Sequence, residues 1–251
     1  MVKKILALVT HPDDAEFLCA GTMALLGQAG CDLIMATMTA GDCGSKELAR
    51  EEISSIRKKE AAQAAAMIQA DYHCLEFDDM FITYDRASIL KVLAFLRKIA
   101  PEVVITMSPD CYMVDHEITS TLVRTACFAA GMTNMDTPGE SPFEPTPYLY
   151  YLDPIEGKDK LGNKIEPATV VDISTVIDLK SDMLACHASQ REWLQKHHRM
   201  DQYLIAMREQ AAMTGEKIGV AYGEGFRQHL GHAYPQHNIL AELLPATAKV
   251  R

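Results

Sequence analysis

The chain has 251 residues, of which 48% are hydrophobic and 23% are charged, so one substantial buried core is expected. Its formal net charge of -10 argues against a nucleic-acid or anionic-membrane partner, because those partners select basic surfaces. The seven scattered cysteines predict reduced thiols in a cytoplasmic protein. No stretch is long enough to span a bilayer, and the apolar run after Lys3-Lys4 lacks the cleavage-site pattern of a signal peptide.

Apolar runs alternate with helix-period segments along the chain, a pattern typical of a parallel sheet covered by helices. Strands are expected at residues 5–9, 33–38, 72–77, 103–107, 148–152 and 169–173. Helices are expected at 45–69, 86–99, 117–130 and 175–197. The proline-rich segment 137–147 is expected to be an ordered loop, either a lid or a surface connector. We predict a single domain spanning 1–251, with a core of about 3–190 and a helical and loop extension at 191–251.

Chemistry-bearing residues follow the first predicted strand directly, in the segment Thr10-His11-Pro12-Asp13-Asp14-Ala15-Glu16. Functional groups of open α/β sheets gather at the carboxyl ends of strands. His11 and Asp14 are spaced i, i+3, so a turn that opens a helix can direct both toward one metal ion, which leaves Asp13 free as a general base. The alternative is that Asp13 or Asp14 only caps the next helix.

The loops after the other early strands carry similar groups. Asp42 follows the second strand, Asp79 follows the third, and His116 lies just beyond the fourth. Because the carboxyl ends of parallel strands share one edge, His116 is the best candidate for a third metal ligand. Asp115 beside it is expected to orient an imidazole from outside the ligand set. The alternative for His116 is a helix-terminal residue that packs or caps.

A His-Asp-His ligand set with one open position suits zinc, and it also admits iron, cobalt or nickel. A metal at such a site lowers the pKa of a bound water toward about 7. Asp13 can take the proton of that water during attack on a carbonyl and later return it to a leaving amine. The arrangement predicts hydrolysis of an amide or ester.

These motifs resemble the paired signatures of the PIG-L/LmbE family of zinc-dependent N-acetylglucosaminyl deacetylases. The matching elements are His11-Pro12-Asp13-Asp14-Ala15-Glu16, Asp115-His116, Thr39-x-Gly41-Asp42-x-Gly44, Arg57-x-x-Glu60, Asp172-Ile173-Ser174, Lys180 and His187-x-x-Gln190. The resemblance covers about residues 3–190. It implies a Rossmann-like three-layer α/β/α sandwich with a mostly parallel sheet and no dinucleotide. It also implies His11, Asp14 and His116 as zinc ligands and Asp13 as the general base.

The resemblance extends to residues near the substrate. Arg57 matches an arginine that helps to hold substrate in relatives, and its alternative is an exposed helix arginine paired with Glu60. Asp42 stands where glutamate is more usual, which shortens its reach. Asp79 is expected to face substrate, with turn capping as the equal alternative. His187 is expected to line the pocket, or else to be an ordinary helix histidine.

One departure from the family pattern affects catalysis. The family commonly has His-Pro-Asp-His in the fourth loop, and its first histidine stabilises the oxyanion or supplies a proton, whereas this chain has Met113 there. A thioether cannot donate a hydrogen bond. We expect either that Tyr112, His187 or a histidine of the tail, at 229, 232 or 237, supplies the missing donor, or that the chemistry is slow or different. The alternative for the tail histidines is a solvated surface position.

The leading hypothesis is therefore a zinc-dependent hydrolase that deacetylates an N-acetylated amino sugar or sugar conjugate. It would act on a small molecule and bind neither nucleic acid nor membrane, and the sequence leaves a homo-oligomer open. A second hypothesis is a catalytically impaired protein that binds metal and sugar, which Met113 alone supports. A third, a dinucleotide-dependent oxidoreductase, lacks the G-x-G-x-x-G motif after strand one.

Overall fold

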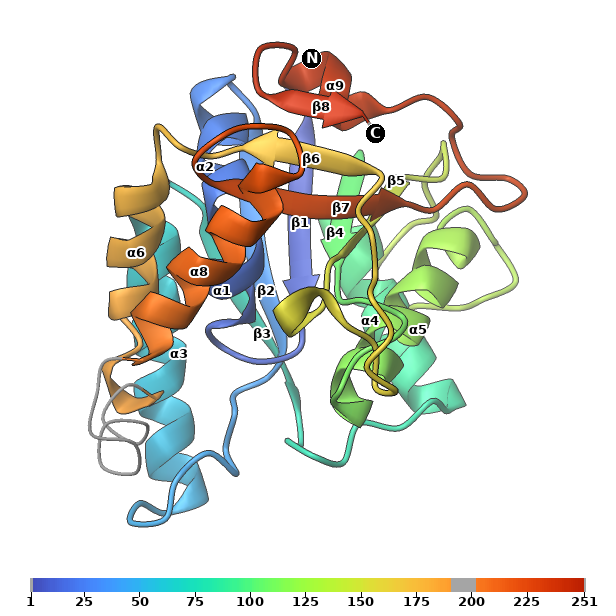
Figure 1. The fold of residues 1–251 in the computed structure, drawn as a ribbon. Helices are drawn as coiled ribbons and strands as arrows, with labels where there is room; N and C mark the ends of the chain where they lie inside the picture. The colour runs from blue at the N-terminus through green and yellow to red at the C-terminus, as the bar shows by residue number, and fades with distance from the viewer. Residues whose placement is uncertain (1, 191–201, 251) are drawn as a thin grey trace.

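A computed structural model describes residues 2–190 and 202–250. They form three layers, a single sheet between two layers of helices (Figure 1). In the described residues the sheet has eight strands in the order β3-β2-β1-β4-β5-β7-β6-β8. The strands are β1 (Lys4–Val9), β2 (Asp32–Thr39), β3 (Asp71–Phe77), β4 (Val103–Thr106), β5 (Tyr148–Leu152), β6 (Thr169–Asp172), β7 (Gly223–Gln228) and β8 (Ala248–Val250). Strands β1 to β5 run parallel, and β7, β6 and β8 continue the sheet with antiparallel pairings.

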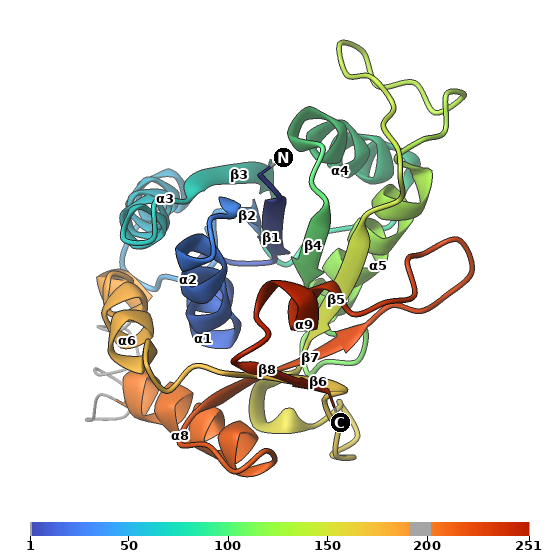
Figure 2. The same ribbon diagram turned by 90° about the horizontal axis from the view of Figure 1, so that it is seen from above.

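Helices cover both faces of the sheet, as Figure 2 shows from above. Helices α1, α2, α3, α6 and α8 lie on one face, and α4 and α5 lie on the other. Their bounds are α1 (Asp14–Leu18), α2 (Ala20–Gln28), α3 (Arg50–Ala66), α4 (Arg86–Ile99), α5 (Val114–Ala129), α6 (Ile177–Ala185), α8 (Gln202–Glu216) and α9 (Ile239–Leu243), with a short 3-10 helix η1 (Ile155–Gly157). Two apolar cores, one on each side, bury the alternating side chains of β1. The predicted three-layer α/β/α sandwich with a mostly parallel sheet is therefore confirmed.

The six predicted strands form within a residue or two of their expected bounds, but some helices differ. Helix α3 begins at Arg50 instead of residue 45, and α5 begins at Val114 instead of residue 117, so His116 lies in the first turn of a helix. Helix α6 ends at Ala185, and the last part of the predicted helix, 191–197, lies outside the described residues. None of the helices within the described ranges is long and apolar enough to cross a membrane.

The stretch after residue 201 differs from the predicted extension, because it completes the sheet. Strand β7 pairs with both β5 and β6, and β8 pairs with β6. Glu224 of β7 accepts hydrogen bonds from the backbone N–H groups of Gly21 and Thr22 at 3.0 and 2.7 Å, and its carboxylate also binds Lys180. The sequence of β7, with two glycines and three polar residues, carries a weak strand signal, and long-range pairing decides its conformation.

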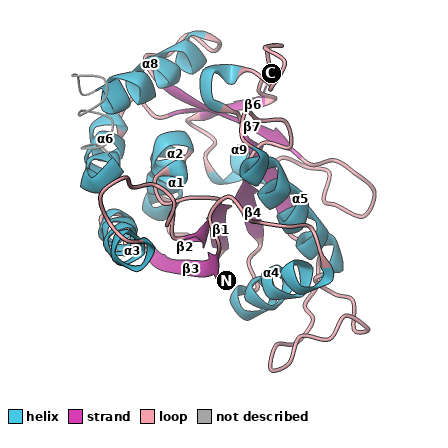
Figure 3. Ribbon diagram, turned by 90° about the horizontal axis from the view of Figure 1, so that it is seen from below, coloured by secondary structure: helices cyan, strands magenta, loops and turns pink. Residues whose placement is uncertain are grey.

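The strand order creates a topological switch point between β1 and β4, since the chain continues to β2 on one side of β1 and returns to β4 on the other. Open parallel sheets bind ligands at the carboxyl ends of strands beside such a point. Figure 3 views this edge of the sheet, with the loops after β1 and β4 next to each other. The segments that carry His11, Asp79 and His116 all begin at this edge.

Asp153, directly after β5, is a buried acid at the same edge. The residue is 8% exposed, and its Oδ1 atom lies 3.5 Å from Nε of Arg227 without the geometry of a hydrogen bond. Burial raises the pKa of Asp153 to about 6, although Arg227 and Lys217 oppose this rise. The folded protein therefore binds this proton more tightly than the unfolded chain does, so stability falls as pH rises from about 4 to about 6.

We expect Asp153→Asn to raise the free energy of unfolding at pH 7 by roughly 2–3 kcal/mol, because asparagine does not ionise. The gain should shrink as pH falls through about 6 and disappear below about 4, where the aspartate becomes protonated in both states. Denaturant unfolding of both proteins from pH 4 to 7 measures this difference. The exposed residue Asp182 gives the control Asp182→Asn, expected within about 0.5 kcal/mol of wild type. Parallel pH profiles for wild type and Asp153→Asn would contradict the expectation.

Candidate metal centre

The turn between β1 and α1 brings His11 and Asp14 side by side. The backbone N–H of His11 donates to Oδ2 of Asp14 at 2.7 Å, which closes the turn around Pro12. Asp13 adopts a left-handed conformation with φ of 100°, and aspartate tolerates this region better than most residues. The side chains of Asp13 and Asp14 therefore have different partners: Asp13 faces Arg57, and Asp14 faces the histidines. The contact between His11 and Asp14 is the one that their i, i+3 spacing predicted.

His116 meets this turn from the first turn of α5. Its Nε2 atom lies 3.3 Å from Nδ1 of His11 and 3.6 Å from Oδ1 of Asp14. Nδ1 of His11 lies 3.4 Å from Oδ2 of Asp14. All three residues are buried, and the three donor atoms lie within 4.8 Å of one another, as ligands of one ion do. The structure thus brings together the two nitrogens and one carboxylate that the sequence selected.

Electrostatics prepare these donors for a cation. Burial lowers the pKa of His116, so this imidazole is neutral and can ligate. Burial also raises the pKa of Asp14, but His116 and His11 outweigh it and lower the value to about 2. For His11, hydrogen bonds to Asp14 and Asp79 overcome burial and raise its pKa to about 10. Without a metal, His11 therefore holds a proton between carboxylates, at a position where a bound cation would replace it.

Two carboxylates face the other ring nitrogen of His11. Nε2 of His11 lies 3.1 Å from Oδ1 of Asp79 and 3.9 Å from Oδ2 of Asp115. A carboxylate on the outer nitrogen fixes the orientation and tautomer of a metal-binding histidine. Asp115 also accepts the backbone N–H of Met80 at 2.8 Å. Asp115 therefore lies against His11 from outside the ligand set, whereas the outer nitrogen of its neighbour His116 has a different partner.

That partner is a thiol. Sγ of Cys111 lies 3.2 Å from Nδ1 of His116, and burial raises the pKa of this cysteine. The backbone N–H of Cys111 donates to Glu117 at 3.1 Å, which fixes the thiol in place. Sequence reasoning missed this contact, because Cys111 is one of seven scattered cysteines and carries no metal-site spacing.

Asp13 is enclosed by Arg57 and Tyr203. Its Oδ2 atom lies 3.6 Å from Nη2 of Arg57, and the Tyr203 hydroxyl donates a hydrogen bond to its carboxylate. The Tyr203 ring lies 5.6 Å from that of Phe17. Burial raises the pKa of Asp13, while Arg57 and Tyr203 act in the opposite direction. Nothing in the sequence pointed to Tyr203, which is 190 positions away and reaches the site only because α8 packs there.

Arg57 lies in the interior and binds backbone, so the alternative of an exposed helix arginine is wrong. It is 5% exposed, and its guanidinium donates to the carbonyls of Pro12 at 2.9 Å and Gly41 at 3.2 Å. A Cβ atom at Gly41 or Gly44 would lie 2.2 or 2.6 Å from Nη1 of Arg57, so glycine is required for this close approach. The alternative pairing with Glu60 does not form, because Glu60 binds Ser189 at 2.6 and 2.9 Å.

The other residues predicted to bind substrate differ in their contacts and in their exposure. Asp42 binds Arg50 and accepts the backbone N–H of Asp79 at 3.0 Å, so it supports the loop that carries Asp79. His187 is fully buried, with Nε2 3.3 Å from Oε1 of Glu16. Tyr112 is 62% exposed, and its ring lies edge-on to His116 with centroids 5.4 Å apart.

The tail histidines and Met113 occupy different parts of the molecule. His229 contacts Tyr151 at 3.0 Å, and its backbone binds Leu149, in the amino-terminal half of β5. His237 contacts Tyr148, the first residue of β5. These two contacts place both histidines away from the carboxyl edge that carries His11. Met113 is partly buried and precedes α5 as its N-cap residue.

Comparisons with known proteins agree with the motifs. The family model described as PIG-L, GlcNAc-PI de-N-acetylase, matches residues 6–127. A diacetylchitobiose deacetylase of Thermococcus kodakarensis is 28% identical over 239 residues, which cover 90% of this chain and 83% of that protein.

Solved structures with the same fold have more than one named activity. The N,N'-diacetylchitobiose deacetylase of Pyrococcus horikoshii superposes with a TM-score of 0.77 at 26% identity, covering 94% of this chain and 88% of the other. A 4-carboxy-2-hydroxymuconate hydratase of Pseudomonas putida KT2440 superposes with a TM-score of 0.74 at 20% identity, covering 94% of this chain and all of the other. The second likeness shows the fold alone, so the reaction has to be argued from the site.

Proposed function

We propose that this chain, whose residues 6–127 match the PIG-L family model, acts as a member of that family and hydrolyses the amide of an N-acetylated amino sugar or sugar conjugate with the help of a divalent metal ion. One observation carries the proposal. The buried donors of His11, Asp14 and His116 converge within 4.8 Å, and the carboxylate of Asp13, which lies outside this donor set, belongs to the residue directly before Asp14. A metal-dependent deacetylase uses both features: the donors hold the ion, and the extra carboxylate transfers protons.

The donor set fits the proposed ion. Two imidazole nitrogens and one carboxylate oxygen are ligands that zinc accepts, and other divalent transition metals accept them too. We assign the ion to Nδ1 of His11, a carboxylate oxygen of Asp14 and Nε2 of His116, with Asp79 holding the outer nitrogen of His11 at 3.1 Å. When bound, such an ion supplies Lewis acidity that lowers the pKa of water and polarises a carbonyl.

We assign the proton transfers to Asp13. Arg57 and Tyr203 favour its ionised form, which allows it to take a proton from the attacking water although burial raises its pKa. The same raised pKa favours return of that proton to the nitrogen of the departing amine. Arg57 also holds the carbonyl of Pro12 and thereby fixes the backbone on which Asp13 stands. In this proposal Arg57 positions the base.

Tyr112 is the candidate that best replaces the donor absent at Met113. Of the proposed replacements, His187 is fully buried against Glu16, and His229 and His237 contact β5 tyrosines. The Tyr112 ring is exposed and edge-on to His116, so its hydroxyl is available on the solvent side of the donor set. We therefore propose that Tyr112 donates to the oxyanion that forms on the acetyl carbonyl.

The alternative of an impaired binding protein is not favoured, because Asp13 is retained and enclosed beside the donors. Zinc as the resident metal and a cytoplasmic location are further parts of the proposal. The free state of all seven cysteines supports a reducing compartment.

Acetate release from metal-loaded protein tests the function. We expect release from N-acetylglucosamine conjugates such as N,N'-diacetylchitobiose, loss of the activity after chelation, and recovery after zinc is added. The free amine that appears should match the acetate in amount. Stoichiometric metal binding without acetate release from a panel of N-acetylated sugars would overturn the proposal in favour of the binding protein.

A further inference from the structure

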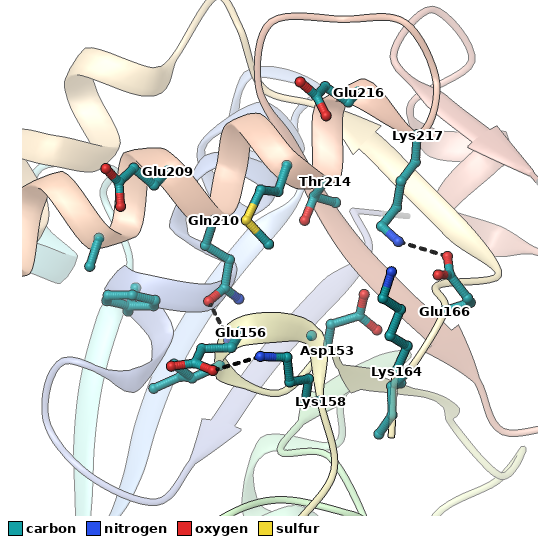
Figure 4. A pocket seen from close by; sticks show the side chains of 16 residues that line it. Asp153, Glu156, Lys158, Lys164, Glu166, Glu209, Gln210, Thr214, Glu216 and Lys217 are labelled. Atoms are coloured by element: carbon teal, nitrogen blue, oxygen red, sulfur yellow. Dashed lines mark hydrogen bonds and ion pairs between the residues drawn. The ribbon is translucent and has the colours of Figure 1, made fainter. Parts of the chain in front are cut away.

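A cavity of about 700 Å³ lies beside the metal-site loops and contains none of the three proposed ligands. It is bounded by α8, by η1 and by the segment that follows η1 (Figure 4). This volume is typical of small-molecule pockets. Its lining includes Phe17, Asp153, Ile155, Gln210, Met213 and Thr214.

The floor of the cavity presents the buried carboxyl of Asp153. Figure 4 shows this carboxyl directed into the cavity, on the side of Thr214 and Lys164. A Cβ atom at Gly225 would lie 2.2 Å from its Oδ2 atom, so a glycine on β7 makes room for the side chain. The folded protein carries the cost of burying this acid, as its raised pKa indicates. A costly buried acid in a cavity is a candidate binding group.

The walls combine apolar surface with neutral polar groups. Phe17, Ile155 and Met213 provide apolar contact, and Thr214 and Gln210 provide a hydroxyl and an amide. Gln210 is held in place because its Oε1 atom accepts the backbone N–H of Glu156 at 3.0 Å. Apolar faces with a few fixed polar groups are typical of ligand pockets.

The charges at the rim largely pair with each other. Lys158 binds Glu156 at 3.2 Å, and Lys217 binds Glu166 at 2.7 Å. The lining as a whole has more acidic than basic residues, so it disfavours phosphate or carboxylate ligands. A neutral ligand with several hydroxyl donors matches the carboxylate oxygens of Asp153 at the floor, which accept hydrogen bonds.

Contacts join this cavity to the metal centre on two sides. Asp153 follows β5, the neighbour of β4, and Arg227 next to it donates to Ser108 of the loop after β4 at 2.7 Å. On the other side, Phe17 of the cavity wall packs on Tyr203, whose hydroxyl binds Asp13.

We propose that this cavity binds an uncharged, hydroxyl-rich sugar ring, with Asp153 accepting hydrogen bonds from ring hydroxyls and the apolar wall contacting the face of the ring. The ring is either the distal unit of the proposed substrate, in which case the inference rests on the proposed function, or a separate sugar. Both sources share the same recognition chemistry, and the test below distinguishes them.

Equilibrium binding to chelator-treated protein tests the proposal without turnover. The probes are N-acetylglucosamine and N,N'-diacetylchitobiose, and calorimetry measures the Kd. Two variants alter opposite parts of the cavity: Asp153→Asn removes the carboxylate, and Ala206→Trp fills the space beside the apolar wall. Asp182→Asn on α6 is the control for Asp153→Asn. Ile205→Trp is the control for Ala206→Trp, because Ile205 is the neighbouring residue on α8 and does not line the cavity.

We expect both cavity variants to raise the Kd on the order of tenfold, the scale of one hydrogen bond to a charged group, with both controls unchanged. An effect on the disaccharide alone assigns the ring to the distal unit of the substrate, and an effect on both sugars assigns a separate sugar. Unchanged Kd values, or no binding of either sugar to wild type, would overturn the proposal. Acetate release by metal-loaded wild type is scored separately, so failure of the deacetylase function is distinguishable from failure of this inference.

Discussion

Asp13→Asn is expected to lower kcat for acetate release by about 10²- to 10⁴-fold, the range that a general acid–base residue contributes. Asparagine has nearly the same shape, and it tolerates the left-handed conformation at φ of 100°, so the turn is retained. It cannot accept the proton of the attacking water. Because burial already raises the pKa of Asp13, the neutral amide should not lower the stability of the fold.

The measurement is steady-state kinetics with metal content determined on the same samples. Metal stoichiometry should stay at the wild-type value, which separates loss of the base from loss of the ion. Asp78→Asn is the matched control, since Asp78 lies beside the same edge with a side chain that is 77% exposed. A kcat within a factor of about three of wild type would exclude Asp13 as the general base, because a positioned base contributes more.

His116→Ala is expected to weaken zinc binding by more than about 100-fold, because loss of an outer partner alone costs roughly 10- to 100-fold. The variant removes the donor that lies 3.3 Å from His11 and 3.6 Å from Asp14. The remaining two donors come from one turn and form only half of a four-coordinate site. Elemental analysis after dialysis, and competition with a chelator of known affinity, measure the change.

His232→Ala serves as the control, because His232 is an exposed histidine of the tail. The unfolding temperature of the metal-free variant shows whether the fold survives removal of the buried imidazole. Stoichiometric, tightly bound zinc in folded His116→Ala would disprove the proposed third ligand and would favour Asp79 and Asp115, which group with His11.

Strands β1 and β7 show where the local sequence predicts a strand and where it does not. Residues Ile5–Val9 of β1 are all apolar, which is typical of a strand that is buried on both faces, and the structure confirms this predicted strand. Strand β7 has the sequence GEGFRQ, and it is a strand because β5 and β6 supply its hydrogen bonds. Such long-range pairing is invisible to any local pattern.

The candidate site divides in the same way. Direct contact between His11 and Asp14 follows from their spacing in one turn, and the position of His116 follows from the shared edge of parallel strands. The inward position of Arg57 does not follow from its helix, because it depends on glycines in another loop. The contacts of Asp79 and Cys111 with the two histidines also depend on how separate loops pack.

The sequence by itself determined the α/β class, the first loop with its two candidate ligands and spare carboxylate, and the family resemblance, because each is carried by short motifs and local periodicity that can be read without knowing how the chain packs. Only the tertiary structure decided the partners of those residues. It placed Tyr203 on Asp13, Arg57 on the backbone of Pro12, and the acid Asp153 under a separate cavity. These contacts join segments up to 190 positions apart, and packing of whole elements, with no local signal, brings them together.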